Sequence, residues 1–181
     1  MEIERSAYDP LAEGDEAYFD AERPRTFDAS LLEAPASVLQ ARRARILSRE
    51  DSVSDAVCAM QKEHRGVVLI TEDGTDASRV IGVFTERDVL FRSMDSGRNP
   101  ATLQLEQVMT SDPECLTEDG TVADVLRLMS VGGFRHVPIV DERRRPVGVV
   151  SVRDVVDLLV EAFPTEILNR GGDRQSEREG G

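Results

Sequence analysis

The sequence predicts a mixed α/β fold in which two β-α-β-β-α repeats pack in pseudo-two-fold symmetry. Within the 181 residues one stretch occurs twice, and each copy alternates short apolar strands with helical patterns. A copy of about 60 residues buries too little surface to be stable alone, so we expect the two copies to share a core. Aromatic residues make up only 4% of the chain and Trp is absent, so that core should be aliphatic.

Three aligned stretches define the repeat. Residues 53–60 recur as 122–129, residues 68–70 as 137–139, and residues 81–88 as 147–154. The offset is 69 in the first two pairs and 66 in the third. The difference lies in a turn that is three residues shorter in the second copy, and hairpin turns tolerate such changes in length.

Each copy predicts the same order of elements. A short strand near Ile46 or Cys115 precedes a helix that begins at Ser52 or Thr121, both of which are typical helix N-caps. Two apolar strands joined by a polar turn follow, and a helix closes the unit. The strands are expected at residues 67–70 and 80–84 in the first copy and at 136–140 and 147–150 in the second, and the closing helices at 88–91 and 154–160.

The two ends of the chain differ from the repeats. Residues 1–36 hold ten acidic residues against three arginines, which is more than half of the formal net charge of −13. They show no sustained period, so we expect an acidic, flexible arm there and a polar, glycine-rich tail at residues 165–181. The repeats then occupy residues 37–98 and 99–164. The basic run at residues 143–145 falls in a hairpin turn and should form a solvated tip.

Composition narrows the possible functions. The net charge of −13 opposes nucleic-acid binding, which depends on clustered Lys and Arg. No run approaches the roughly 18 apolar residues of a membrane helix, and the N-terminus lacks a signal-peptide pattern, so a cytoplasmic location without membrane insertion is expected. Cys58 and Cys115 are isolated, which favours reduced thiols over a metal site. No known catalytic motif is present, so an enzyme is not expected.

The motif with chemical content is Gly-x-x-[Ser/Thr]-x-Arg-Asp, placed in both copies where a strand runs into a helix. A glycine lets a flat ligand approach the backbone, and a hydroxyl at a helix start lies where a phosphate is favoured. The arginine adds a charged donor, and the acid can accept the hydroxyls of a ribose. The motif consists of Gly82, Thr85, Arg87 and Asp88 in the first copy and Gly148, Ser151, Arg153 and Asp154 in the second.

A structural interpretation of this motif competes with ligand binding. A Ser or Thr followed three residues later by an acid also forms a helix capping box. The occurrence of the motif twice, in register and with the same glycine and arginine, favours ligand binding. Capping and binding can also coexist in one motif.

Three stretches around the motif, residues 108–110, 133–141 and 148–154, resemble the family of CBS (cystathionine-β-synthase) domains. Over about residues 37–163 the chain is similar to a tandem CBS domain pair, or Bateman module. The resemblance implies a regulatory module, with no obligatory cofactor, that binds AMP, ADP or ATP in clefts between the repeats, or less often S-adenosylmethionine or NAD. It also implies a disc-shaped homodimer that acts on a regulated protein partner.

The resemblance nominates the site residues. Asp88 and Asp154 would accept ribose hydroxyls, and the strand before the second hairpin would supply phosphate donors from Arg135 and His136. Each cleft would borrow the opening strand of the other repeat, from residues 40–45 or 110–114. The full predicted set is Thr85, Arg87, Asp88, Thr110, Arg135, His136, Pro138, Ser151, Arg153 and Asp154.

The two clefts are expected to be unequal. In the first copy Gly66 and Val67 stand where the second copy has Arg135 and His136. We therefore expect the cleft at Asp154 to be the stronger nucleotide site. Two other functions stay open: a dimeric interaction scaffold with weak or empty ligand sites, and a nucleotide hydrolase.

Overall fold

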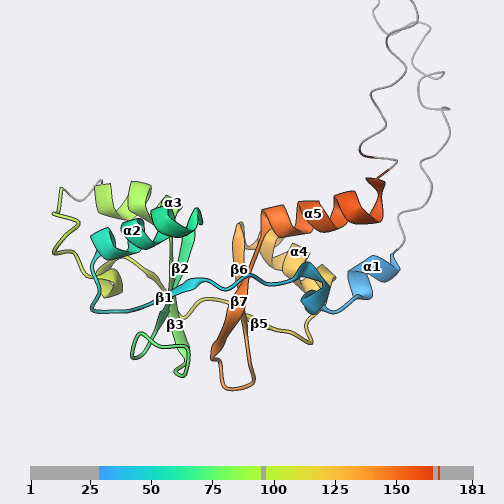
Figure 1. Ribbon diagram of the computed structural model, residues 1–181, viewed down its shortest axis with the longest axis horizontal. Coiled ribbons are helices and arrows are strands. Elements are labelled where there is room, and N and C mark those ends of the chain that lie inside the picture. Colours follow the sequence, from blue (N-terminus) through green and yellow to red (C-terminus); the bar gives the residue numbers. More distant parts are fainter. Residues whose placement is uncertain (1–28, 95–96, 165–166, 168–181) are drawn as a thin grey trace, which may run out of the picture. The chain divides into compact units, whose positions relative to one another are not determined.

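The computed structural model describes residues 29–94, 97–164 and 167 (Figure 1). The chain divides into two units, residues 1–31 and residues 32–181. Most of the predicted acidic arm and nearly all of the predicted tail lie outside the described residues. Every element from η1 onward belongs to the second unit, which holds both repeats.

The predicted α/β repeats are confirmed. The chain begins with α1 (Ser30–Glu33) and η1 (Ala36–Leu39). The first repeat comprises β1 (Arg45–Ser48), α2 (Val53–Glu63), β2 (Val67–Thr71), β3 (Val80–Thr85), α3 (Glu86–Asp88) and the π-helical turn η2 (Val89–Met94). The second comprises η3 (Leu105–Gln107), β4 (Thr110–Ser111), β5 (Leu116–Thr117), α4 (Val122–Val131), β6 (His136–Val140), β7 (Pro146–Ser151) and α5 (Val152–Ala162). None of the helices that the structure describes is long and apolar enough to cross a membrane.

The parallel strand pairs of the two sheets have the same register. One sheet has the order β1-β2-β3-β4 and the other β5-β6-β7, and in each a parallel pair leads into an antiparallel hairpin. Leu47 pairs with Ile70 in the first sheet, and Leu116 pairs with Ile139 in the second. Both residues of the second pair follow those of the first by 69, so the sequence repeat is also a repeat of strand register.

Two short segments cross from one repeat to the other. Arg42, ahead of β1, forms an antiparallel bridge with Val149 in β7, and Thr110 in β4 pairs with Val83 in β3. The motif glycines lie under these crossings. A Cβ on Gly148 would lie 2.9 Å from the carbonyl oxygen of Arg42, and one on Gly82 would collide with the Met109 sulfur. The interpretation of these glycines as openings for a ligand is therefore wrong, because protein fills the space.

The core consists of three apolar clusters, one in each repeat and one shared, and they are aliphatic except for the buried Phe84 in the first repeat. The shared cluster combines Val67, Leu69 and Val80 with Val140 and Val149 of the second repeat. It confirms that the copies bury their apolar surfaces together.

Apolar residues of the segments that connect the repeats pack in the core of the neighbouring repeat. Leu103 and Leu105 follow residue 98 yet pack in the core of the first repeat. Ala36 belongs to the predicted arm but is buried in the core of the second repeat with Leu39. The reason is the same on both sides, since each crossing segment carries apolar residues to the other repeat.

Arg144 in the turn between β6 and β7 joins the two repeats, so the prediction of a solvated tip is wrong for this residue. It has a left-handed φ of 63°, and its carbonyl accepts the amide of Val80, the first residue of β3, at 2.8 Å. Its Nη2 donates to Asp112 Oδ1 at 2.8 Å and to the Pro113 carbonyl at 3.0 Å. The neighbouring Arg143 is exposed, as expected of a tip.

Candidate functional site

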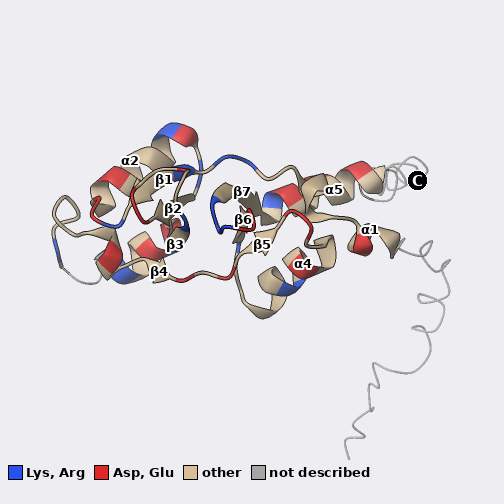
Figure 2. Ribbon diagram, turned by 90° about the horizontal axis from the view of Figure 1, so that it is seen from below, with Lys and Arg blue, Asp and Glu red and all other residues tan. Residues whose placement is uncertain are grey.

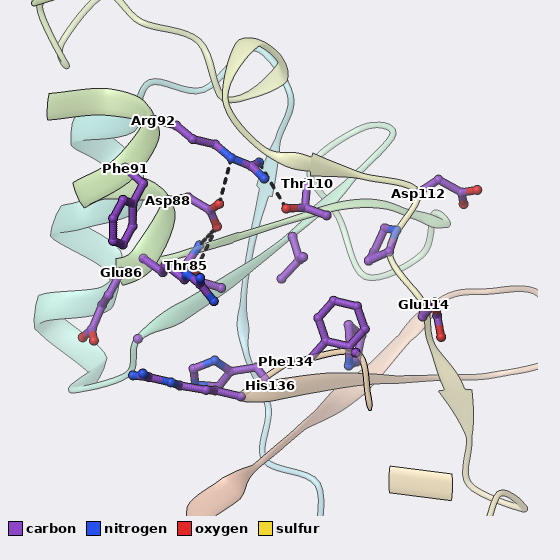
Figure 3. A pocket seen from close by; sticks show the side chains of 18 residues that line it. Thr85, Glu86, Asp88, Phe91, Arg92, Thr110, Asp112, Glu114, Phe134 and His136 are labelled. Atoms are coloured by element: carbon purple, nitrogen blue, oxygen red, sulfur yellow. Dashed lines mark hydrogen bonds and ion pairs between the residues drawn. The ribbon is translucent and has the colours of Figure 1, made fainter. Parts of the chain in front are cut away.

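A pocket of about 580 Å³ lies between the two repeats (Figure 3). Its walls come from the end of β3 with α3 and η2, from the segment between β4 and β5, and from the loop that leads into β6. This volume is typical of sites that enclose small molecules or cofactors.

The pocket gathers seven of the ten predicted site residues, namely Thr85, Arg87, Asp88, Thr110, Arg135, His136 and Pro138. The other three, Ser151, Arg153 and Asp154, lie at the start of α5 and are not among its lining residues. The grouping therefore differs from the expected one. Arg135 and His136 line the pocket of Asp88, because the loop before β6 faces α3 of the other repeat.

The Asp88 side chain is only 11% exposed, and both of its carboxylate oxygens are in contact with neighbouring residues. Oδ2 accepts the amide of Thr85 at 2.9 Å and the Thr85 hydroxyl at 2.7 Å. Oδ1 pairs with Arg92 Nε at 3.3 Å, and Arg92 Nη1 also donates to Thr110 Oγ1 and to the Val108 carbonyl. Oδ1 thus keeps one acceptor position for a ligand hydroxyl, since each oxygen accepts about two hydrogen bonds.

Asp154 repeats this arrangement with an arginine from a different element. Its Oδ2 accepts the amide and hydroxyl of Ser151 at 2.7 and 2.6 Å. Its Oδ1 pairs with Arg42 Nε at 2.8 Å. Arg42 comes from the segment that crosses between the repeats, whereas Arg92 belongs to the same helical segment as Asp88.

The capping interpretation of the motif is confirmed for Ser151 and Asp154. The Ser151 hydroxyl accepts the Asp154 amide at 3.4 Å while it donates its own proton to the carboxylate. Thr85 likewise donates its hydroxyl proton to Asp88. In this state the carboxylates accept both hydroxyl protons in hydrogen bonds, and a further partner of either hydroxyl would have to donate to it.

His136 is half-buried, and its burial lowers the pKa of its imidazole from 6.5. The carboxylates of Glu86 and Asp154 act in the opposite direction, and the Arg135 guanidinium adds to the lowering. At neutral pH His136 is therefore an uncharged donor of a single N–H. Arg135 is the stronger candidate for an anionic group in this part of the pocket.

We expect the stability of the fold to decrease as the pH falls below 6.5, in part because of His136. Burial disfavours the imidazolium in the folded state, so the unfolded chain takes up the proton at a higher pH than the folded chain. Protonation therefore stabilises the unfolded state relative to the folded state. Above pH 6.5 the imidazole is neutral in both states and makes no contribution. Urea unfolding measured between about pH 5 and pH 8 gives the free energy of unfolding as a function of pH. Below pH 6.5 this free energy should fall less steeply in His136→Gln than in the parent chain. The attribution to His136 would be contradicted if His136→Gln left the pH dependence of the free energy of unfolding unchanged, or if His64→Asn removed it.

Sequence reasoning missed several pocket residues, in particular Glu86, Phe91, Arg92 and Phe134. Phe91 is 70% exposed, and the Arg87 guanidinium lies 5.7 Å from the centre of its ring. Two of the aromatics of an aromatic-poor chain therefore line one pocket. Phe134 stands inside one of the stretches that carry the family resemblance, which is the only signal that could have pointed to it.

The pocket carries no excess of positive charge. Its charged side chains are the carboxylates of Glu86, Asp88, Asp112 and Glu114 and the guanidinium groups of Arg87, Arg92 and Arg135. Among the described residues no group of His, Cys, Asp and Glu could hold a metal ion. The arrangement suits hydrogen bonding to hydroxyls and stacking of a ring more than capture of a polyphosphate.

The two repeats form a domain pair with a pocket at their junction. The family model of the CBS domain matches residues 40–95 and 105–161, which together are more than half of the chain. The chain therefore belongs to the CBS domain family, as the sequence indicated.

Two curated relatives illustrate the extent of the similarity. A 17.7 kDa protein encoded in the bps2 3′ region of Acidianus ambivalens is 32% identical over 114 residues, covering 61% of this chain and 63% of the relative. The mitochondrial CBS domain-containing protein CBSX3 of Arabidopsis thaliana is 28% identical over 120 residues, covering 65% of this chain and 57% of the relative. The chain thus matches less than two thirds of the length of either.

Solved structures agree on the fold. The CBS-domain containing protein ATU1752 of Agrobacterium tumefaciens has a TM-score of 0.61 at 24% identity, covering 74% of this chain and 98% of the other. The CBS domain pair of protein MJ0100, solved with 5′-methylthioadenosine and S-adenosyl-L-methionine, has a TM-score of 0.60 at 22% identity, covering 70% of this chain and 99% of the other. At these identities the likeness concerns the fold alone.

Proposed function

We propose that the chain is a regulatory module that binds an adenosine-containing molecule in the pocket at Asp88 and is not an enzyme. The observation that carries the proposal is the position of Asp88, a nearly buried carboxylate in a pocket of suitable volume with one acceptor position left on Oδ1. A carboxylate in such a position can fix the hydroxyls of a ribose. Binding of both hydroxyls requires Arg92 to give up part of its contact with Oδ1.

The charges of the pocket favour a ligand with few or no phosphates. Four carboxylates face three guanidinium groups, so the three terminal phosphates of ATP would find little net attraction. AMP can use Arg135, and S-adenosylmethionine or 5′-methylthioadenosine needs no phosphate site. The structure of MJ0100 with the last two compounds supports this chemistry for a related fold. For this pocket we therefore favour AMP over ADP and ATP among the nucleotides that the sequence suggested.

A ligand panel tests the proposal against its alternatives. Thermal unfolding of the full chain would be measured with AMP, ADP, ATP, 5′-methylthioadenosine, S-adenosylmethionine and NAD. A ligand at a hundred times its Kd should add about 2.7 kcal/mol of stability. If no compound stabilises the chain at millimolar concentration, an interaction scaffold with empty clefts is the better account. Steady release of product from ATP would instead indicate a hydrolase.

We also propose that the module forms a homodimer through the outer faces of η2 and α5. These faces expose Leu90 at 62%, Val152 at 43% and Val156 at 48%, which is apolar surface that a monomer leaves in water. Light scattering at micromolar concentration should show a dimer that Val156→Glu converts to monomer. Val131→Glu is the matched control, because Val131 is also exposed but ends α4. A monomeric parent chain would contradict the proposal.

The regulated partner and the cytoplasmic location stay predictions from the sequence. Nucleotide-dependent regulation needs a second protein whose contact changes when the pocket fills. We expect ligand binding to alter the surface of η2 first, because Phe91 and Arg92 belong to η2 and also line the pocket.

A further inference from the structure

A second pocket, of about 460 Å³, is formed by the first repeat alone. Its walls come from β1 and α2, which lie beside each other, and Figure 2 shows acidic and basic residues on α2. None of its lining residues lines the pocket at Asp88, so the two pockets are separate. The lining residues are Arg45, Leu47, Asp51, Asp55, Cys58, Ala59, Lys62 and Glu63.

This second pocket brings together an amine and a thiol. The 22 Lys and Arg residues of the chain include a single lysine, Lys62, and Cys58 is one of two cysteines. Both side chains are exposed. Within the part of the chain that the structure describes, neither side chain has a hydrogen-bond or ion-pair partner. Both groups are therefore available as nucleophiles, which the arginines of the chain are not.

Cys58 and Lys62 are four residues apart on α2, so they lie on the same face of the helix. At this spacing the Cβ atoms are about 5–6 Å apart. Helical side chains lean toward the N-terminus of their helix, which directs the long Lys62 stem toward Cys58. A group bound to the Cys58 sulfur is thus within reach of the Lys62 amine.

We propose that Cys58 and Lys62 form a modification site that takes a small uncharged acyl group from a thioester and leaves it on Lys62. The Cys58 thiolate attacks the thioester carbonyl carbon, a new C–S bond forms, and the donor thiol leaves with its electron pair and takes up a proton. The neutral Lys62 amine then attacks the same carbon. The C–N bond of an amide forms, the C–S bond to Cys58 breaks, and the amine proton passes to the departing thiolate. No oxidant or further reactant is needed.

The other residues of the second pocket suit a short, uncharged acyl group. Leu47 and Ala59 provide apolar surface for its carbon atoms. The charged groups around Lys62 are the carboxylates of Asp51, Asp55 and Glu63 and the guanidinium of Arg45. An acyl group with a carboxylate of its own would be repelled by this excess of negative charge.

Acylation would give the module a covalent input that is separate from the adenosine pocket. It removes the positive charge of Lys62 in the last turn of α2, where the helix dipole favours a cation. The helix α2 packs against η2, which carries Phe91 and Arg92 of the Asp88 pocket. The modified helix therefore adjoins an element that lines the other site.

Mass spectrometry of the full chain tests the proposal. The parent chain and its variants would be incubated at about pH 8 with S-acetyl-N-acetylcysteamine, a small neutral thioester. Hydroxylamine would then remove acetyl groups from sulfur and leave amides in place. We expect a resistant acetyl group, mapped to Lys62 by peptide analysis, to form at least about tenfold faster in the parent chain than in Cys58→Ser. In Lys62→Arg the acetyl group should stay on Cys58 and be removed.

Two controls separate proximity from general reactivity. The double variant Lys62→Arg/Arg127→Lys moves the single lysine to α4, which contains no cysteine, and keeps the net charge; the Arg127 side chain is 60% exposed. The relocated lysine should react as slowly as Lys62 does in Cys58→Ser. Cys115→Ser should react like the parent chain, because Cys115 lies outside the second pocket and burial raises the pKa of its thiol.

Equal acetylation of Lys62 in the parent chain and in Cys58→Ser, or equally fast acetylation of the relocated lysine, would overturn the proposal. So would faster transfer of a succinyl than of an acetyl group. Acetyl coenzyme A identifies the source: a faster reaction than with the small thioester indicates that the carrier is bound too, and an equal or slower one that the acyl group alone is recognised. Both results support the site. Binding of 5′-methylthioadenosine should be the same in the parent chain and in Cys58→Ser, so failure of acyl transfer leaves the proposed adenosine pocket intact.

Discussion

Replacement of Asp88 by Asn is expected to weaken binding of adenosine compounds at least tenfold. The substitution removes the charge and leaves one oxygen, which the amide and hydroxyl of Thr85 already occupy. A hydrogen bond to a charged group contributes about 1.5–3 kcal/mol, and about 1.4 kcal/mol corresponds to a factor of ten in Kd. Calorimetric titration of AMP and 5′-methylthioadenosine into both chains measures the effect.

The chain supplies a matched control for this variant in Asp124. Asp124 accepts the amide and hydroxyl of Thr121 at 3.1 and 2.8 Å, in a capping box that is not part of the pocket. Asp124→Asn should cost a similar amount of stability and leave ligand binding unchanged. If both variants lose affinity equally, the loss reflects a weakened helix start, and Asp88 has no direct role in binding.

Replacement of Arg144 by Ala is expected to destabilise the fold by about 1–2 kcal/mol. The variant loses the hydrogen bonds from the guanidinium group to Asp112 and to the Pro113 carbonyl, and a long one of 4.0 Å to the Cys115 sulfur. The Asp112 side chain is 81% exposed and regains water, which limits the cost. The substitution also removes the buried Nε of Arg144, which has no hydrogen-bond partner, and this offsets a further part of the lost stability. Urea unfolding monitored by circular dichroism provides the measurement.

Arg143→Ala is the control, because Arg143 lies in the same turn with an exposed side chain. It should change stability by less than about 0.5 kcal/mol. Arg144→Ala should also weaken ligand binding, since Asp112 and Pro113 line the pocket and lose their anchor. Equal stability of the two variants would show that Arg144 does not hold the repeats together.

The fold could be predicted because local signals and the internal repeat agree. Ser52 and Thr121 cap α2 and α4 as their residue types indicate, and the apolar runs 67–70 and 136–140 form β2 and β6. The packing of the crossing segments could not be read from the sequence, because each of them packs in the opposite repeat. The residues that cross, such as Leu105, have no local feature that says which core receives them.

The site could be predicted by residue type but not by grouping. Residue spacing placed Thr85 beside Asp88, and the resemblance pointed to Arg135 and His136 as donors. Which acid shares a pocket with those donors depends on how the two hairpins face each other, and that follows from long-range packing of the shared cluster. The ion pair of Arg92 with Asp88 could not be predicted from the internal repeat, because the second copy has Leu158 at the position that corresponds to Arg92.

A crystal structure of the chain grown with 5′-methylthioadenosine or AMP tests the central claim most directly. The account predicts that the ligand lies in the pocket between the repeats, with both ribose hydroxyls within hydrogen-bond distance of Asp88 Oδ1 and with Arg92 displaced from its present 3.3 Å contact. A ligand bound without contact to Asp88, or an empty pocket at saturating concentration, would contradict it.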